Sequence, residues 1–363
     1  MKYPSLLSGA QILSELDTYD TLIDVRSESE FALDHIPGAI NCPVLHNDER
    51  VRVGTLSKQE NAFEAKKIGA ALVAKNIAEH LQSQFLEKPK DWRPLVYCWR
   101  GGNRSGSLAH ILAKIGWPAV QIEGGYREYR HEVINQLDEL PHQLRFAVIC
   151  GTTGSGKSRL LTTLANAGAQ VLDLEKLAAH RGSVLGGLPD ENQPSQKLFE
   201  SRVWNVLRYC APNQPILVES ESKKIGNLRV PEVLMEKIRS SECIRLTIDT
   251  SQRVKLLIED YPHLTNDSER LIALLAHLTP LHGHEKMRQW QSLVHSGAID
   301  TLVEALLVEH YDPAYVKSIG RNFKNYDAGM VIDMPDISSA AFEGAARQIM
   351  QKLNLAPNIP DEV

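Results

Sequence analysis

FAVICGTTGSGKSRLL, residues 146–161, combines a phosphate-binding motif with the strand and the helix that such a motif requires. Its central residues fit the pattern G-x-x-x-x-G-K-[ST]: Gly151, Thr152, Thr153, Gly154, Ser155, Gly156, Lys157 and Ser158. In this motif backbone N–H groups wrap a diphosphate, the lysine neutralises a terminal phosphate, and the final hydroxyl is a ligand for Mg²⁺. Because an apolar run precedes the motif and a helical pattern follows it, the stretch predicts a strand, a phosphate-binding loop and a helix.

The chain around this loop predicts an α/β domain over residues 142–363. Further apolar strands, QVLDLE (170–175), PILVES (215–220) and CIRLTID (243–249), alternate with helical segments, which favours a parallel sheet. From about residue 251 the pattern is mainly helical. We therefore expect a P-loop NTPase-like α/β domain with a mainly helical C-terminal part.

Three residues outside the loop are further candidates for this site. Asp173 and Glu219 stand at the ends of predicted strands, where carboxylates could lie near a metal ion. Arg253 stands where kinase-like P-loop domains often carry a nucleotide-contacting arginine, and a surface salt bridge is the alternative. A strand in the position of Glu219 usually ends in aspartate, which argues against ordinary hydrolysis of a Mg–nucleotide. The ligand of the loop, a nucleotide or another diphosphate, stays open at this point.

Residues 12–136 predict a separate N-terminal domain with a parallel sheet. TLIDV (21–25) and PLVYC (94–98) are short apolar strands, and helical patterns lie between and after them. The polar stretch HEVINQLDELPHQLR (131–145) contains a proline and predicts a junction between the two domains.

The stretch VYCWRGGNRSGSLAHIL, residues 96–112, predicts a reactive cysteine over an anion-binding loop. Cys98 follows the strand PLVY, and a helix begins within a few residues of it. Backbone N–H groups at the start of a helix stabilise a thiolate, which is the nucleophilic form of cysteine. The loop residues supply flexible backbone and positive charge: Arg100, Gly101, Gly102, Asn103 and Arg104. An ordinary strand-to-helix turn with a buried cysteine is the alternative.

Composition narrows the class of protein. The chain has 363 residues, enough for two domains, and no apolar run reaches the length of a membrane span. Its formal charge of −5 gives no overall attraction to nucleic acid or membrane. The five cysteines include no CxxC pair, which argues against a zinc ribbon or a disulfide framework. We expect a cytoplasmic protein that has no membrane partner and no tightly bound cofactor.

The N-terminal half resembles the rhodanese (sulfurtransferase) family. The resemblance rests on LIDVRSESEFALDHIPGAINCP, the loop at Cys98 and IEGGYREYR. It implies that Cys98 carries sulfur or selenium. Common rhodaneses have the pattern C-x-x-G-x-R, whereas five residues separate Cys98 from Arg104 here. That C-x5-R spacing is also the signature of rhodanese-fold phosphatases. Two functions therefore remain possible for this domain: a phosphatase, or a carrier of sulfur or selenium whose donor resembles phosphate.

The fusion of such a domain to a P-loop domain resembles the bacterial tRNA 2-selenouridine synthase family. The supporting stretches are YCWRGGNRSGSLAHIL, IEGGYREYR, GTTGSGKSRLL, DLEKLAAHRGSVLGG, ILVESESKKIG and HYDPAY. The resemblance implies action on the wobble 2-thiouridine of tRNAs for lysine, glutamate and glutamine. Geranyl diphosphate S-geranylates this base, and selenium from selenophosphate then replaces the geranylated sulfur, with Cys98 as S-selanylcysteine carrier. An enzyme that supplies selenophosphate would be a partner.

Two segments are candidates for contact with tRNA: SKKIGNLR (222–229) and KSIGRNFKNY (317–326). Both are locally basic, and Tyr326 could stack on an unpaired base.

Two alternatives to a tRNA 2-selenouridine synthase remain. One is a sulfurtransferase or C-x5-R phosphatase with a regulatory nucleotide-binding domain. The other is a nucleotide-switched binding module in which the rhodanese-like domain is only a docking surface.

Overall fold

The computed structural model describes residues 3–59, 61–183, 186–187 and 191–355. The chain divides into two compact units. The first consists of Met1–Leu137 with Pro194–Asn205, and the second of Asp138–Gln193 with Val206–Val363. Among the described residues, no helix has the length and apolar character needed to cross a membrane.

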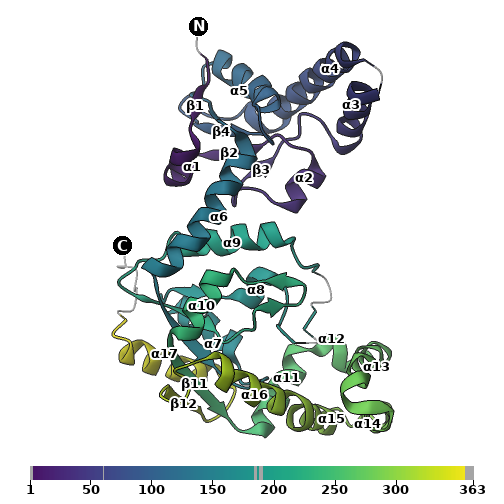
Figure 1. The fold of residues 1–363 in the computed structure, drawn as a ribbon, viewed down its shortest axis with the longest axis vertical. Coiled ribbons are helices and arrows are strands. Elements are labelled where there is room, and N and C mark those ends of the chain that lie inside the picture. Colours follow the sequence, from purple (N-terminus) through teal and green to yellow (C-terminus); the bar gives the residue numbers. More distant parts are fainter. Residues whose placement is uncertain (1–2, 60, 184–185, 188–190, 356–363) are drawn as a thin grey trace. The chain divides into compact units, whose positions relative to one another are not determined.

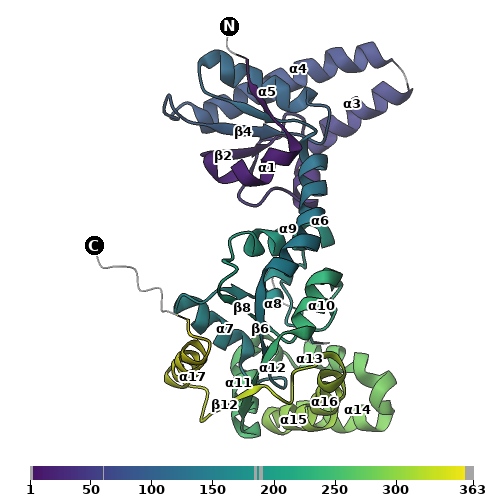
Figure 2. The same cartoon turned by 60° about the vertical axis from the view of Figure 1, so that its left-hand side comes forward.

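The first unit is built on a parallel sheet with the strand order β1-β5-β4-β2-β3. The strands are β1 (Ser5–Leu7), β2 (Thr21–Asp24), β3 (Ile40–Asn41), β4 (Pro94–Tyr97) and β5 (Val120–Ile122). The helices are α1 (Gly9–Glu15), α2 (Glu28–Leu33), α3 (Asn47–Gln59), α4 (Ala62–His80), α5 (Asn103–Ile115) and α6 (Gly125–Gln143). Helices α4 and α5 cover one face of the sheet and α1 lies on the other (Figure 2). Because β4 is central and buried along its whole length, the residue that follows it lies at the middle of one sheet edge.

The second unit has its own parallel sheet, with the strand order β12-β11-β6-β8-β7. The strands are β6 (Arg145–Cys150), β7 (Val171–Leu172), β8 (Pro215–Glu219), β11 (Glu242–Ile248) and β12 (Met330–Met334), and β9 (Lys224–Ile225) pairs with β10 (Leu228–Arg229) in a separate hairpin. Parallel strands end at the same sheet edge. The phosphate loop after β6, Asp173 after β7 and Glu219 at the end of β8 therefore meet there.

Helices surround this sheet and continue beyond it (Figure 1). Their bounds are α7 (Lys157–Asn166), α8 (Leu174–Ala178), α10 (Glu232–Ser240), α11 (Thr250–Asp260), α12 (Pro262–Thr265), α13 (Ser268–Leu275), α14 (Thr279–His295), α15 (Ile299–Leu306), α16 (Asp312–Asn322) and α17 (Ser339–Lys352). The remaining helix, α9 (Gln196–Leu207), belongs mostly to the first unit. Helices α7 and α17 share one apolar core with the sheet. Helices α12 to α15 form a second core around Trp290, which places a helical layer beside the edge that carries the loop.

The fold class is confirmed: a rhodanese-like parallel-sheet domain precedes a P-loop α/β domain with a helical C-terminal portion. Two details differ from the expectations. Strand β12 lies within the part expected to be mainly helical, and it pairs with β11. The stretch 131–145 expected to be a junction lies largely in α6, which accommodates Pro141 near its C-terminal end.

The boundaries 12–136 and 142–363 remain a prediction. In the structure β1 precedes residue 12 and belongs to the first sheet, and the first unit also takes Pro194–Asn205 from the later part of the chain. Residues 356–363 of the expected second domain, and Val184 and Leu185 of the quoted stretch DLEKLAAHRGSVLGG, lie outside the described residues.

Candidate active sites

The phosphate loop spans the residues between β6 and α7. Gly156 is the residue that precedes α7, and its φ of 84° lies in the left-handed region. Gly154 has a φ of 76°. A Cβ at Gly156 would lie 2.6 Å from the ring of Phe342, so a larger residue is excluded by space as well as by backbone conformation. These two glycines let the loop turn tightly into the start of α7, where unpaired N–H groups bind anions.

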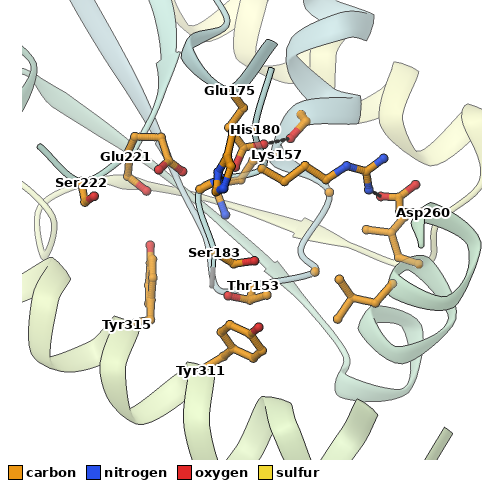
Figure 3. A pocket seen from close by; sticks show the side chains of 18 of the residues that line it. Thr153, Lys157, Glu175, His180, Ser183, Glu221, Ser222, Asp260, Tyr311 and Tyr315 are labelled. Atoms are coloured by element: carbon orange, nitrogen blue, oxygen red, sulfur yellow. Dashed lines mark hydrogen bonds and ion pairs between the residues drawn. The ribbon is translucent and has the colours of Figure 1, made fainter. Parts of the chain in front are cut away.

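Lys157 and Ser158 open helix α7 and point into this site. The ammonium of Lys157 donates to the carbonyl oxygens of Gly151 at 2.7 Å and Thr152 at 3.4 Å. The hydroxyl of Ser158 donates to Oε2 of Glu175 at 2.9 Å. Figure 3 shows Lys157 and Glu175 on the same side of the pocket. The predicted cation and hydroxyl of the motif are thus brought together with a carboxylate from α8.

Four carboxylates lie around these two residues: Asp173, Glu175, Glu219 and Glu221. Burial is the main cause that raises the pKa of each, and repulsion by neighbouring carboxylates adds to it at Glu175, Glu219 and Glu221. The pKa of Glu175 rises to about 7. Oε1 of Glu219 accepts the backbone N–H of Glu175 at 2.8 Å, while its Oε2 is buried without a hydrogen-bond partner among the described residues. The site therefore sets four carboxyl groups against the cation of Lys157, and their raised pKa values favour the protonated form of these groups.

This donor set fits Mg²⁺. The ion prefers oxygen ligands, and Ser158 supplies a hydroxyl while Glu175 and Glu219 supply carboxylates. Asp173 is partly committed elsewhere, since its side chain accepts the N–H of Lys176 at the start of α8. Of the two carboxylates expected near a metal ion, Glu219 has an oxygen, Oε2, that is still available as a ligand.

Arg253, on α11, holds the phosphate loop through a hydrogen bond to its backbone. Its Nε donates to the carbonyl of Thr153 at 2.9 Å, and its two terminal nitrogens bind the carboxylate of Asp312 at 2.9 and 2.5 Å. The Arg253 residue is 4% exposed and the side chain of Asp312 is 28% exposed, so the ion pair is partly buried and not a surface one. In this arrangement the guanidinium positions the loop.

A pocket of about 690 Å³ opens over the loop. Its wall includes Lys157, Glu175 and Glu221, together with Tyr261 between α11 and α12, Tyr311 directly before α16, and Tyr315 of α16. Ser222, from the first basic segment, also borders it, as do Ser318 and Asn322 from the second. Tyr326 itself lies under the guanidinium of Arg245, 4.9 Å from the ring centre. Both segments proposed for nucleic acid therefore adjoin the pocket.

Cys98 follows β4 and is 1% exposed. Its Sγ accepts a hydrogen bond from Ser105 Oγ, 3.3 Å away in the first turn of α5. Gly101 and Gly102 have φ values of 67° and 73°, and Gly102 directly precedes α5. The predicted loop therefore exists as a left-handed turn that joins the thiol to a helix N-terminus, while Arg100 and Asn103 are exposed.

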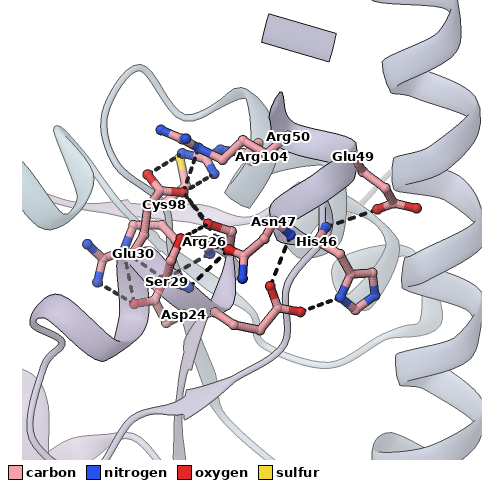
Figure 4. Close-up of polar contacts among 12 residues, drawn as sticks. Asp24, Arg26, Ser29, Glu30, His46, Asn47, Glu49, Arg50, Cys98 and Arg104 are labelled. Carbon is pink, nitrogen blue, oxygen red and sulfur yellow. Dashed lines mark hydrogen bonds and ion pairs between the residues drawn. The ribbon is translucent and has the colours of Figure 1, made fainter. Parts of the chain in front are cut away.

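The positive charge of Arg104 at this loop is paired with the carboxylate of Glu30. Arg104 binds Glu30 through two contacts, of 2.9 and 3.4 Å, and Arg50 Nε lies 2.9 Å from the same carboxylate. Burial raises the pKa of Glu30, but hydrogen bonding and charge from Arg104 outweigh it, and the net pKa is lowered. Figure 4 shows the guanidinium groups of Arg50 and Arg104 gathered beside Cys98. The predicted arginine is present, and α3 contributes a second one.

The start of α6 fixes the Cys98 backbone. The carbonyl of Cys98 accepts the N–H of Tyr126 at 2.7 Å. Gly125 has a φ of 61°, and a Cβ there would lie 2.3 Å from the same carbonyl oxygen. Below this point, Asp24 and Arg26 form a fully buried ion pair of 2.6 Å, so they hold the framework of the site and do not face a ligand.

Sequence reasoning missed several members of these sites. Glu175 and Glu221 are not among these, because they stand at the strand ends Asp173–Glu175 and Glu219–Glu221, where the sequence indicates carboxylates near a metal ion. Glu30 lies in the quoted stretch LIDVRSESEF. Arg50 and Asp312 carried no signal, because their roles depend on contacts with residues far away in the chain.

Comparison with known proteins agrees with this division. The family model described as "tRNA 2-selenouridine synthase AAA domain" matches residues 144–289, and the model of the rhodanese-like domain matches residues 8–132. A tRNA 2-selenouridine synthase of Nitrosomonas europaea is 37% identical over 266 residues, which are 72% of this chain and 68% of that protein. Those of a Sulfurovum species and of Alcanivorax borkumensis are each 30% identical, over 83% and 92% of this chain and 89% and 95% of theirs.

Proposed function

The chain belongs to the tRNA 2-selenouridine synthase family, and on that premise we propose that it converts wobble 2-thiouridine in tRNA to 2-selenouridine in two steps. The first step attaches a geranyl group from geranyl diphosphate to the sulfur. The second replaces the geranylated sulfur with selenium that derives from selenophosphate, with Cys98 as the carrier. The substrates are the tRNAs for lysine, glutamate and glutamine.

The phosphate loop suits the first step. The thiouridine sulfur attacks the first carbon of the geranyl chain, the carbon–oxygen bond breaks, and diphosphate leaves with the electron pair. Loop N–H groups and Lys157 would stabilise the charge that develops on the leaving group. Mg²⁺ held by Ser158 and the neighbouring carboxylates would neutralise the remainder. Without a cation, those of the carboxylates that are ionised would repel a diphosphate.

The observation that carries the proposal for the second step is the setting of Cys98. Its Sγ lies at the start of α5 beside Ser105, with Arg50 and Arg104 next to it. A phosphate-sized anion that bears selenium could exchange with Glu30 for these guanidinium groups. The Sγ thiolate would attack selenium, and the P–Se electron pair would leave with phosphorus as phosphite. The perselenide selenium would then attack C2 of the pyrimidine, and geranylthiolate would leave with its electron pair. An external thiol would finally cleave the Sγ–Se bond, which releases the selenouridine and leaves a mixed disulfide on Sγ for a second thiol to reduce.

The two basic segments support approach of tRNA to the pocket over the loop. Lys223, Lys224 and Lys317 are exposed, and each lies close in sequence to a residue of the pocket wall. Contacts of this kind with phosphates would position the anticodon region without reading its sequence.

The test incubates the protein with thiolated tRNA, geranyl diphosphate and selenophosphate, digests the RNA, and weighs the nucleosides. We expect 2-selenouridine from the wild type, and S-geranyl-2-thiouridine alone from Cys98→Ser. Cys210→Ser, which changes a half-buried thiol of the second unit, serves as the control and should behave as the wild type. Seleno-uridine from Cys98→Ser would exclude the carrier role.

The C-x5-R spacing favours one competing function, a phosphatase. The same preparations are therefore given an aryl phosphate. Phosphate release that depends on Cys98, together with no geranyl- or selenouridine in the tRNA assay, would replace the proposal with that function.

A further inference from the structure

A second, smaller pocket lies in the helical layer beside the phosphate loop. Its volume is about 70 Å³, and aliphatic side chains form most of its wall: Leu264, Leu271, Ile299, Leu302, Val303 and Leu306. They come from α12, α13 and α15, and several also belong to the apolar core of these helices. The pocket therefore extends into the apolar core of these helices.

This apolar pocket adjoins the pocket over the loop. The two share wall residues: Thr153, Ser183, Leu257, Tyr261 and Tyr311. Thr153 is itself part of the phosphate loop, and the side chain of Leu257 lies 3.0 Å from where a Cβ of Gly154 would stand. Figure 3 shows Thr153, Ser183 and Tyr311 close together at this boundary. A chain attached to a diphosphate in the loop would therefore meet the apolar pocket directly.

The wall of the apolar pocket offers little to a polar ligand. The hydroxyl of Thr265 donates within its own helix, to the carbonyls of Tyr261 and Pro262 at 3.4 Å each. None of the described wall residues has a buried polar side-chain atom that lacks a partner. A ribose or a nucleobase placed here would lose hydrogen bonds to water without replacement, whereas a hydrocarbon chain would gain from burial.

We propose that this apolar pocket binds the hydrocarbon tail of a prenyl diphosphate whose diphosphate is held by the phosphate loop. The inference rests on the proposed function, and it assigns the tail to specific residues of the helical layer. The chain passes Thr153 and Leu257 at the rim, and its terminal part enters between α13 and α15. The ligand of the loop is then a prenyl diphosphate and not a nucleotide.

The size of the pocket sets a limit on the tail. Its volume of about 70 Å³ is small beside the about 690 Å³ of the pocket over the loop, so it has room for a short apolar group only. This space suits a terminal isoprene unit, with the preceding unit at the rim beside Tyr261 and Tyr311. A third unit would meet the side chains of Leu271 and Leu302, so geranyl diphosphate should be preferred over farnesyl diphosphate.

The test compares dimethylallyl, geranyl and farnesyl diphosphates as donors to thiolated tRNA, with the full-length protein. Val303→Trp should fill the pocket and lower kcat/KM for geranyl diphosphate at least about tenfold. Leu302→Ala should enlarge the pocket and raise the ratio of farnesyl to geranyl transfer at least about fivefold. Val308→Trp is the matched control, because Val308 is 55% exposed and does not line the pocket.

Binding of inorganic diphosphate, measured by calorimetry, separates this inference from the proposed function. The inference is supported if Val303→Trp binds diphosphate as the wild type does but transfers geranyl poorly. It is overturned if the wild type transfers geranyl while Val303→Trp and Leu302→Ala keep the wild-type preference among the three donors. A wild-type protein that binds diphosphate but transfers no prenyl group to tRNA would instead refute the proposed function. If Val303→Trp fails to fold, the donor ratio of Leu302→Ala decides alone.

Discussion

Ser158 Oγ and Glu175 Oε2 are joined by a hydrogen bond of 2.9 Å that links the phosphate loop to helix α8. The carboxylate that accepts this bond has a pKa of about 7, raised mainly by burial and further by the charge of Glu221. The hydroxyl of the motif is therefore paired with a group that titrates near neutral pH. A change in the protonation of Glu175 changes both the charge and the hydrogen bonding at the loop.

The first prediction concerns the pH dependence of stability. Glu175 has an ordinary pKa of 4.5 and a pKa of about 7 in the folded chain, so the folded state binds more protons between these values. The free energy of unfolding should fall as pH rises through this window, by at most about 1.4 kcal/mol per pH unit from this group. Glu175→Gln should flatten that slope in urea denaturation between pH 5 and pH 7. Glu285→Gln, at an exposed position, should keep it, and an unchanged slope in Glu175→Gln would refute the assignment.

The second prediction separates the two chemical steps. Lys157→Ala removes the cation that should stabilise the leaving diphosphate, so geranylation should fall about a hundredfold or more. Selenation of RNA that already carries S-geranyl-2-thiouridine should continue, because it does not need the diphosphate site. Mass analysis of digested RNA measures both steps. Lys255→Ala, an exposed lysine on α11, is the control, and intact geranylation in Lys157→Ala would count against the assignment.

The third prediction concerns the support of the loop. Arg253→Met breaks the ion pair with Asp312 and the hydrogen bond to Thr153. It should destabilise the second unit by roughly 2–3 kcal/mol, below the value for a fully buried pair because Asp312 is 28% exposed. Asp312→Asn should cost less, since the bond to Thr153 remains. A double-mutant cycle measured by chemical denaturation should give a cost for the double variant that is smaller than the sum.

The fourth prediction tests the contact between α6 and the Cys98 loop. Gly125→Ala would place a Cβ 2.3 Å from the carbonyl oxygen of Cys98, whereas Gly38→Ala, at a φ of 84°, meets no atom within 4 Å. Gly38→Ala should therefore cost only the backbone strain, about 1 kcal/mol. Gly125→Ala should cost at least about 2 kcal/mol more and should change the rate at which Cys98 is alkylated. Equal unfolding midpoints for the two variants would show that the loop is not held by this contact.

Short contiguous motifs allowed most of the site to be predicted from sequence. The phosphate loop and the Cys98 loop each join a strand to a helix within a few residues, so their geometry follows from local chain conformation. The parallel topology then brings Asp173 and Glu219 to the same edge, which the alternation of strands and helices already indicated.

The rest depends on long-range contacts that no local pattern encodes. Arg104 was expected to bind an anion, and it pairs with Glu30 across 74 positions of sequence. Strand β12 was missed because MVIDM is short and follows a run of helices; only its pairing with β11 gives it a place. Pro141 suggested a break, but it lies in the last turn of α6, so it removes one N–H hydrogen bond and few helical residues follow it.

The first unit is formed by two separate segments of the chain, and this limits where the protein can be cut into fragments that fold. Trp204, on α9, packs edge-on against the ring of Tyr129 and donates to Gln136 at 2.7 Å, and Arg130 forms an ion pair with Glu200. A fragment that ends at residue 137 would retain Tyr129 and Arg130 without these partners. Any attempt to express the sulfurtransferase-like half alone, or to exchange it for that of a relative, should therefore carry Pro194–Asn205 as a separate piece joined by a new linker.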